Sequence, residues 1–328
     1  MKSNRLIKLA LLSFSALSAQ HVLAHQTPTV LDNEDYEIEK KLGLDIDCGA
    51  DASALQKALG KAYSAQLVQL TVTGECAGPL YIQHGRFEII NDAGLSGSIR
   101  VKHNQEYQQK AAVLLSSSNV AFKNINIDVP NDMPAVEIKA NSLAKFNHVS
   151  TNAKSPNDSS FLQFLITDNS TAYFEKMSGN SVGVYGSSFV EFSKRSDQIK
   201  LEVYDTSAAQ SAQNNHFRSV QVAGNGYFLG DNQSNVNLLM IWSKGAAEIN
   251  NQSRVGEIMM GGQSHFAAYK ESLVAGPYSL WGNVVFELEH STAYNWKAVD
   301  KPYSIIIGNN AHVNGKLYPG WSWTGQAK

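Results

Sequence analysis

The segments SVGVYGSSFVEFSKRS (residues 181–196), SVQVAGNGYFLGDNQS (219–234) and RVGEIMMGGQSHFAAYKES (254–272) repeat one pattern. Each contains an alternating apolar stretch, a corner of small residues, a second alternating stretch and a polar turn. Self-similarity at a nearly constant period of this size is typical of a solenoid. We therefore expect one structural unit to recur along the chain and to stack on its neighbours.

The small-residue corners serve as markers of the repeat beyond these three segments. The spacings between successive markers are 28, 18, 19, 18, 20, 19, 18 and 27 residues. The markers are Ser142, Ser170, Ser188, Ser207, Asn225, Gly245, Ser264, Gly282 and Asn309.

Apolar residues alternate on both sides of these corners, and a step of two places side chains on one face of a strand. Beyond the corners the pairs are Ala144 and Phe146, Ala172 and Phe174, Val190 and Phe192, Tyr227 and Leu229, Ala247 and Ile249, and Phe266 and Ala268. Before them the pairs are Val136 and Ile138, Val182 and Val184, Val220 and Val222, Ile258 and Met260, and Ile305 and Ile307. Leucine-rich repeats share the period but need leucines in a fixed frame and a helical return. The pattern predicts an all-β fold, a right-handed parallel β-helix solenoid with a short N-terminal capping helix.

These motifs, with GPLYIQHGRFEIINDAGLSGSIRV (78–101) and NVAFKNINIDV (119–129), resemble the right-handed parallel β-helix superfamily of pectate lyases, polygalacturonases and autotransporter passengers. The resemblance covers roughly residues 45–320 and matches no specific enzyme family. It implies the architecture only, because this fold hosts enzymes, adhesins and inert scaffolds alike.

Residues 1–24 have the features of a secretory signal peptide, with three basic residues, a short apolar run and small residues before a cleavage site after about Ala24. We therefore predict a secreted or periplasmic protein. No other stretch is apolar enough to span a membrane. The remaining chain has 24 basic and 29 acidic residues. A net charge of about −5 without a basic stripe argues against nucleic acid as a partner.

We expect residues 25–44 to be a polar leader and residues 45–328 to be a single β-helix domain. Helical spacing predicts a capping helix at about 51–65, which would cover the open end of the solenoid. The residues that suggest it are Leu55, Ala58, Leu59 and Tyr63, behind an Asp51 or Ser53 cap. A C-terminal cap is expected at about 313–328.

Cys48 and Cys76 are the only cysteines. In an exported chain an even pair indicates a disulfide. Catalytic thiol chemistry is the alternative, but it needs a partner histidine and a reason to stay reduced.

Aromatic residues gather late in the chain and are the candidate ligand-binding residues: Trp281, Trp296, Tyr278 and Tyr294. Flat rings lining a groove would suit stacking on sugars. The alternative is a structural role, in which KLYPGWSW (316–323) and nearby rings close the C-terminal end of the solenoid.

Catalytic motifs are weak, so no catalytic residue, metal ligand or cofactor is predicted. GNSVG (179–183) has the letters of a nucleophile elbow around Ser181, but a strand follows where a helix is needed. The chain has neither an adjacent Asp pair nor a GHG motif of the polygalacturonase kind. A lyase site built on Lys200 or Lys244 remains an alternative. The seven histidines after residue 25 show no zinc-ligand spacing.

The sequence therefore suggests a non-enzymatic, adhesin-like surface or envelope protein that binds carbohydrate or a cell-surface partner. The first alternative is a polysaccharide lyase or glycoside hydrolase with a non-standard site. The second is a structural or assembly subunit. An acidic pair or a Lys–Tyr cluster would favour the enzyme, and exposed rings in a row would favour binding.

Overall fold

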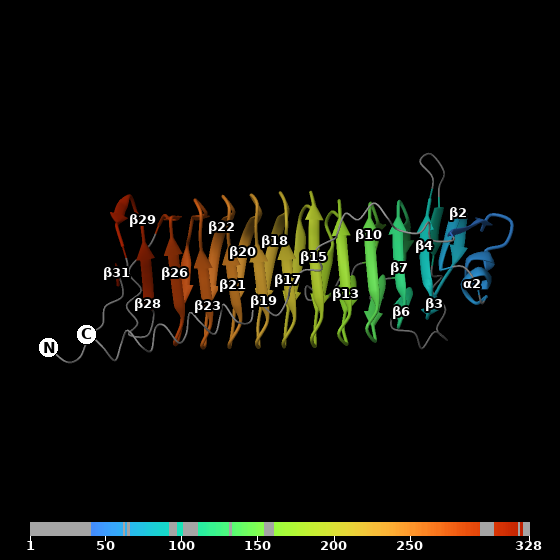
Figure 1. The fold of residues 1–328 in the computed structure, drawn as a ribbon, viewed down its shortest axis with the longest axis horizontal. Helices are drawn as coiled ribbons and strands as arrows, with labels where there is room; N and C mark the ends of the chain where they lie inside the picture. The colour runs from blue at the N-terminus through green and yellow to red at the C-terminus, as the bar shows by residue number, and fades with distance from the viewer. Residues whose placement is uncertain are drawn as a thin grey trace. The chain divides into compact units, whose positions relative to one another are not determined.

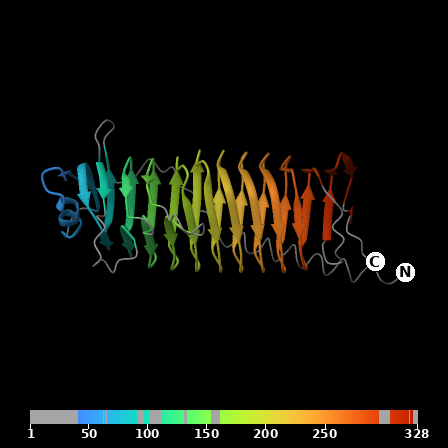
Figure 2. The same cartoon turned by 180° about the vertical axis from the view of Figure 1, so that it is seen from behind.

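The structure is a computed structural model that describes residues 41–61, 63, 66–91, 97–100, 111–130, 133–153, 161–295, 305–320 and 322–323. These residues belong to one compact unit, Lys40–Lys328. Within it, strands lie side by side in chain order, and the view from behind shows the same arrangement (Figures 1 and 2). The predicted signal peptide and most of the predicted leader lie outside the described residues.

The first of two long sheets takes one strand from each coil, and all its strands pair in parallel except the last, β31. Its strands are β1 (Lys41–Asp47), β2 (Leu67–Ala77), β4 (Arg86–Ile90), β7 (Asn119–Lys123), β10 (Leu143–Asn147), β13 (Thr171–Glu175), β15 (Phe189–Lys194), β17 (Ala208–Ser211), β19 (Tyr227–Gly230), β21 (Ala246–Ile249), β23 (His265–Ala268), β26 (Val285–Glu289), β28 (Ile305–Asn309) and β31 (Ser322–Trp323). A short branch pairs with the second half of β2 and contains β5 (Gly97–Arg100), β8 (Asn126–Asp128) and β11 (Ser150–Thr151).

The second sheet takes the other strand of each coil and is parallel up to β29. Its strands are β3 (Leu80–Gln83), β6 (Val113–Ser116), β9 (Val136–Lys139), β12 (Phe164–Ile166), β14 (Ser181–Val184), β16 (Ile199–Val203), β18 (His216–Val222), β20 (Asn235–Ile241), β22 (Arg254–Met260), β24 (Leu273–Val274), β25 (Tyr278–Leu280), β27 (Thr292–Ala293), β29 (Ala311–Val313) and β30 (Lys316–Tyr318). Together the two sheets form the parallel β-helix solenoid that the repeat predicts.

Both ends of the stack differ from the regular coils. At the N-terminal end, the capping helix is α2 (Ala54–Leu59), which is shorter than predicted and buries Leu55, Ala58 and Leu59. Ser53 makes no side-chain capping bond; instead Asp51 accepts hydrogen bonds from the Ser53 backbone and hydroxyl. Strand β1 includes residues 41–44, which the sequence suggested as the end of the leader. At the C-terminal end, β30 and β31 run antiparallel to β29 and β28.

The regular coils repeat every 19 residues, and two ladders of buried polar residues line their corners. In the first, each backbone N–H donates to the hydroxyl of the next coil, as Ser170 does to Ser188 at 3.2 Å and Ser188 to Ser207 at 3.3 Å. The second ladder consists of Ser196, Asn215, Ser234, Ser253, Ser272 and Ser291, all at most 2 % exposed. Serine fits these corners because its small side chain satisfies a buried backbone donor.

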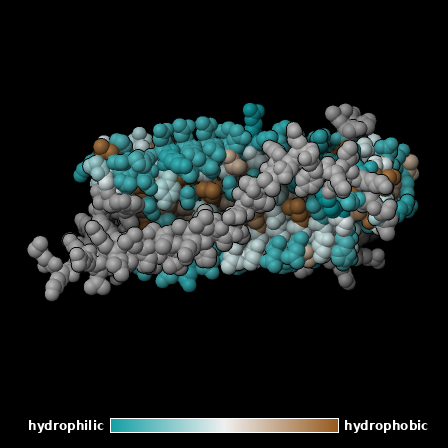
Figure 3. Space-filling view, viewed as in Figure 1, coloured by the Kyte–Doolittle hydropathy of each residue, from teal (hydrophilic) through white to brown (hydrophobic). Residues whose placement is uncertain are grey.

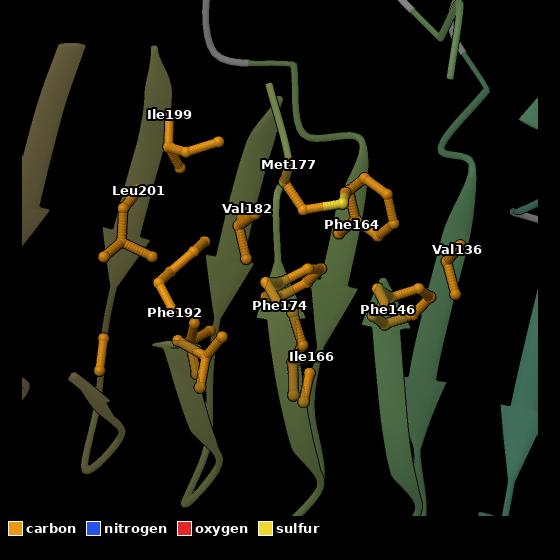
Figure 4. Packing of buried hydrophobic residues seen from close by; sticks show 14 of the residues in the cluster. Val136, Phe146, Phe164, Ile166, Phe174, Met177, Val182, Phe192, Ile199 and Leu201 are labelled. Carbon is orange, nitrogen blue, oxygen red and sulfur yellow. The ribbon is translucent and has the colours of Figure 1, made fainter. Parts of the chain in front are cut away.

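The core between the sheets is apolar and contains a column of stacked phenylalanines (Figure 4). Phe122, Phe146, Phe174 and Phe192 occupy equivalent positions in successive coils, with ring centroids 5.0–5.4 Å apart. Phe164, from the second sheet, meets two of these rings edge-on. On the outside, the face seen in Figure 3 is mostly hydrophilic, with hydrophobic residues in small separate areas.

Strand register corrects three of the nine predicted corner markers. The residues equivalent to Ser207 are Gly226 and Val284, not Asn225 and Gly282, and Asn309 ends β28. The shift of one residue reverses the faces of β19, so buried Phe228 lies in the core in place of Tyr227. Ile305 and Ile307 likewise belong to the first sheet rather than to a strand before a corner.

Candidate ligand-binding face

The outer face of the second sheet carries a row of aromatic and very small residues across six neighbouring coils. Each member follows an inward-facing side chain and donates its backbone N–H to the preceding coil, as Trp242 does to Val222 and Trp281 to Met260. The six residues, called the aromatic row below, are Tyr185, Tyr204, Ala223, Trp242, Gly261 and Trp281. Because neighbouring strands lie about 4.8 Å apart, the row extends for roughly 24 Å along the stack.

Small residues between the rings let them lie flat against one another. The Trp242 and Trp281 rings stack across Gly261, with centroids 5.7 Å apart and planes at 23°. A Cβ at Gly261 would lie 2.8 Å from the Trp242 ring. Trp281 is 38 % exposed, so part of its ring area faces solvent. The pair therefore forms a broad aromatic surface on the outside of the sheet.

We expect Gly261→Ala to separate the two indoles, because the new methyl group would occupy the space between them. The near-ultraviolet circular dichroism of the tryptophans should change, while the thermal midpoint should fall by no more than a few degrees, roughly the effect of 1 kcal/mol. Gly43→Ala is the matched control, since a Cβ there meets nothing within 4 Å. An unchanged tryptophan spectrum in the Gly261 variant would contradict the stacked arrangement.

The N-terminal part of this face is polar. The Tyr185 and Tyr204 rings stack at 5.5 Å, and the Tyr185 hydroxyl donates to the Glu202 carboxylate at 3.3 Å. Lys200 and Glu202 form an ion pair at 2.8 Å with side chains only 15 % and 11 % exposed. Gln221 donates to the Tyr204 hydroxyl at 2.6 Å. Burial and then the Glu202 charge raise the pKa of both tyrosines, so both phenols stay protonated at neutral pH.

A second row of side chains lies at the corner, two residues after each member of the aromatic row. All six are exposed, and five are uncharged hydrogen-bonding groups. This corner ladder consists of Ser187, Thr206, Asn225, Lys244, Gln263 and Asn283. The face thus combines flat rings with a regular series of hydroxyl and amide groups.

The four predicted ligand-binding residues occupy different environments. Trp281 lies in the aromatic row, and Tyr294 is 49 % exposed after β27. Tyr278 packs edge-on against Phe286 at 5.7 Å and donates its hydroxyl to the Val274 carbonyl. Trp296 lies outside the described residues. Tyr294 is in register with Ala275, six residues before Trp281, so it lies about 20 Å across the sheet from the aromatic row.

Sequence reasoning missed Trp242, Tyr204 and Tyr185, because they are not clustered along the chain. A signal was nevertheless present: Tyr185, Tyr204 and Trp242 fall at multiples of the 19-residue coil. The expected Lys200 alternative proved partly informative, since Lys200 does lie in a Lys–Glu–Tyr cluster.

A separate acid–histidine–tyrosine cluster lies on the outer face of the first sheet. Tyr227 donates its hydroxyl to Glu248 at 3.1 Å, and His265 lies 3.5 Å from Glu287. Burial raises the pKa of Glu248, while the Tyr227 hydrogen bond and His265 act in the opposite direction. Burial, followed by the nearby Glu287 and Glu248, also raises the pKa of Tyr269. Register places Glu248 and Glu287 two coils apart, with Ala267 between them.

We expect Glu248→Gln to stabilise the protein at neutral pH but not in acid. The folded state raises the pKa of Glu248, so the protonated form favours folding; this contribution is full below the unfolded pKa and is lost as pH rises through the folded pKa. The variant's thermal midpoint should exceed that of the wild type by about 1–3 °C at pH 7 and match it near pH 4. Exposed Glu271→Gln is the control. A lower midpoint at pH 7 would show that the Tyr227 hydrogen bond outweighs desolvation.

Other sequence candidates show no catalytic arrangement. Ser181 is buried in β14, and its hydroxyl donates to the Phe161 carbonyl at 2.9 Å. Within the described ranges, no three His, Cys, Asp or Glu side chains are grouped so as to hold a metal ion. The described part of the chain also contains no helix of sufficient length and apolarity to cross a bilayer.

Comparisons with known proteins returned no match: none to a family model, none to a curated protein and none to a solved structure.

Proposed function

We propose that this protein is an exported, non-enzymatic binding protein that holds an extended carbohydrate against the outer face of the second sheet. The aromatic row is the observation that carries the proposal, above all the Trp242–Trp281 pair stacked across Gly261. Aromatic faces contact the C–H faces of sugar rings, and a row about 24 Å long suits a linear chain rather than a single small molecule.

The corner ladder supports the same proposal. Sugars carry a hydroxyl on most ring carbons, and a binding site needs polar groups that fix the orientation of a stacked ring. Exposed hydroxyl and amide groups recur once per coil beside the rings, from Ser187 to Asn283. A linear glycan that crosses the strands would meet a ring and a hydrogen-bonding group at repeated intervals.

Export is supported by the Cys48–Cys76 disulfide, because disulfides persist in oxidising compartments. The predicted signal peptide, with cleavage after about Ala24, belongs to this proposal.

The test is retention of the purified protein on immobilised or gel-embedded polysaccharides. We expect Trp281→Ala to weaken binding about tenfold or more, since buried aromatic anchors dominate many interfaces and 1.4 kcal/mol corresponds to tenfold. Tyr81→Ala is the matched control: Tyr81 is also 38 % exposed and lies on the same sheet, but many coils away in β3. Tyr294→Ala should likewise leave binding unchanged.

Two results would contradict the proposal. The first is equal loss of binding in the Trp281 and Tyr81 variants. The second is wild-type self-association, seen by sedimentation, that Trp281→Ala abolishes; this would assign the row to an interface between copies of the chain.

Polysaccharide cleavage is a second candidate, favoured by the cluster on the first sheet. A carboxyl with a raised pKa, such as Glu248, suits a general acid, and Glu287 provides a second carboxylate near the same histidine. Incubation with neutral and acidic polysaccharides, followed by assays for reducing ends and unsaturated ends, tests it. Product release that Glu248→Gln and Glu287→Gln abolish would establish cleavage, and its absence across the panel would favour binding alone.

A further inference from the structure

We infer that the ligand of the aromatic face is an uncharged glycan rather than a uronate polymer, an inference that rests on the proposed binding function. The charge pattern of the face distinguishes these two classes. An acidic polysaccharide carries one carboxylate per sugar, so its binding site needs repeated cationic groups, and arginine is the side chain best suited to clamp a carboxylate.

The cations on this face do not form such a series. Lys200 is already paired with Glu202 at 2.8 Å, and both side chains are largely buried, so this pair adds no net charge. A second acid, Glu257, lies in the strand between the two tryptophans. Lys244 is the only basic residue in the corner ladder, and the aromatic row contains none. A polyanion would therefore place carboxylates beside Glu202 and Glu257 with one exposed lysine to compensate, and exposed lysines contribute little.

The hydrogen-bonding groups instead match hydroxyls. Tyr185, Lys200 and Glu202 offer donors and acceptors in one fixed cluster, held by the 3.3 Å bond between Tyr185 and Glu202. Ser187 and Thr206 are hydrogen-bonded to each other at 2.9 Å, so this part of the corner ladder is already oriented. Neutral amide and hydroxyl side chains both donate and accept, as sugar hydroxyls do.

The experiment uses pairs of polymers that differ only in charge. Affinity electrophoresis of the full chain would compare β-1,4-mannan with β-1,4-mannuronan, and methyl-esterified polygalacturonate with its free acid; cellulose- and xylan-type oligomers extend the neutral set. We expect binding to at least one neutral polymer, at least about tenfold tighter than to its acidic counterpart and nearly independent of salt. Lys244→Ala should leave this binding unchanged, and Trp281→Ala should abolish it.

The outcomes separate the inference from the proposed function. Tighter, salt-sensitive binding of the acidic polymers, lost in Lys244→Ala and Trp281→Ala, would overturn the neutral-ligand inference while leaving the binding function standing. Retention on none of the polymers would overturn both.

Discussion

Replacing Phe174 with alanine is expected to lower the free energy of unfolding by about 3–5 kcal/mol. The Phe174 ring is fully buried and contacts three others: Phe146 at 5.0 Å, Phe192 at 5.2 Å and Phe164 at 5.4 Å. Its removal leaves a cavity between both sheets at a point where neighbouring coils depend on each other for burial. We place the expected loss near the upper end of the range, since the strands on either side are held in register and cannot collapse freely.

Denaturant titration provides the measurement, with both midpoint and slope recorded, because stacked repeats can lose cooperativity. Phe189→Ala is the matched control: this phenylalanine lies in the next coil but on the outer face, where its nearest ring is Tyr173 at 6.5 Å. The control should cost no more than about 1 kcal/mol. Equal losses in the two variants would mean that the inner column contributes no more than surface packing.

The fold was predictable because a 19-residue coil repeats its chemistry at every turn. Serine at positions such as Ser188, Ser207 and Ser264 satisfies the same backbone donor in each coil, so period and corner coincide. Where the corner residue was chosen by turn chemistry alone, the marker slipped. Asn225 looks like a turn residue, but Gly226 occupies the corner. Since side chains in a strand alternate, that single step exchanged Tyr227 for Phe228 in the core.

The candidate site was harder to predict because its residues are neighbours across coils rather than along the chain. Trp242 and Trp281 are 39 residues apart but stack through Gly261. Tyr278 is only three residues from Trp281, yet it packs against Phe286. Finding the row requires knowledge of the register, and insertions break the period early in the chain, where 33 residues separate Ile89 from Phe122. The late tryptophans were therefore a partial signal of a longer row.

The clusters of charged residues follow the same rule. His265 was expected to approach a residue one coil away, and Glu287 is that residue. Neither Glu248 nor Glu287 stood out in the sequence, because a lone glutamate on a strand is usually solvated. Their significance comes from the outer face they share with Tyr227 and from the burial that raises the pKa of Glu248.

Loss of the Cys48–Cys76 disulfide should have the other large effect on stability, about 3–4 kcal/mol on the chain-entropy model for a loop of this length. The two cysteines are 28 residues apart, and the loop they close contains α2, the helix packed on the first strands. This end of the stack has a neighbouring coil on one side only, so β1 depends on β2 and on the covalent link for its position.

The double variant Cys48→Ala, Cys76→Ala provides the test, compared with wild-type protein in the presence and absence of reductant. Reduced wild type and the double variant should lose the same stability, and reductant should not affect the variant further. Hydrogen exchange should localise the loss: amides of α2 and β1 should exchange faster, whereas those of β20 should change little, because a solenoid transmits stability mainly between adjacent coils. Uniformly faster exchange along the whole stack would show instead that the N-terminal coil nucleates the solenoid, and an unchanged unfolding midpoint after reduction would show that α2 and β1 hold this end without the covalent link.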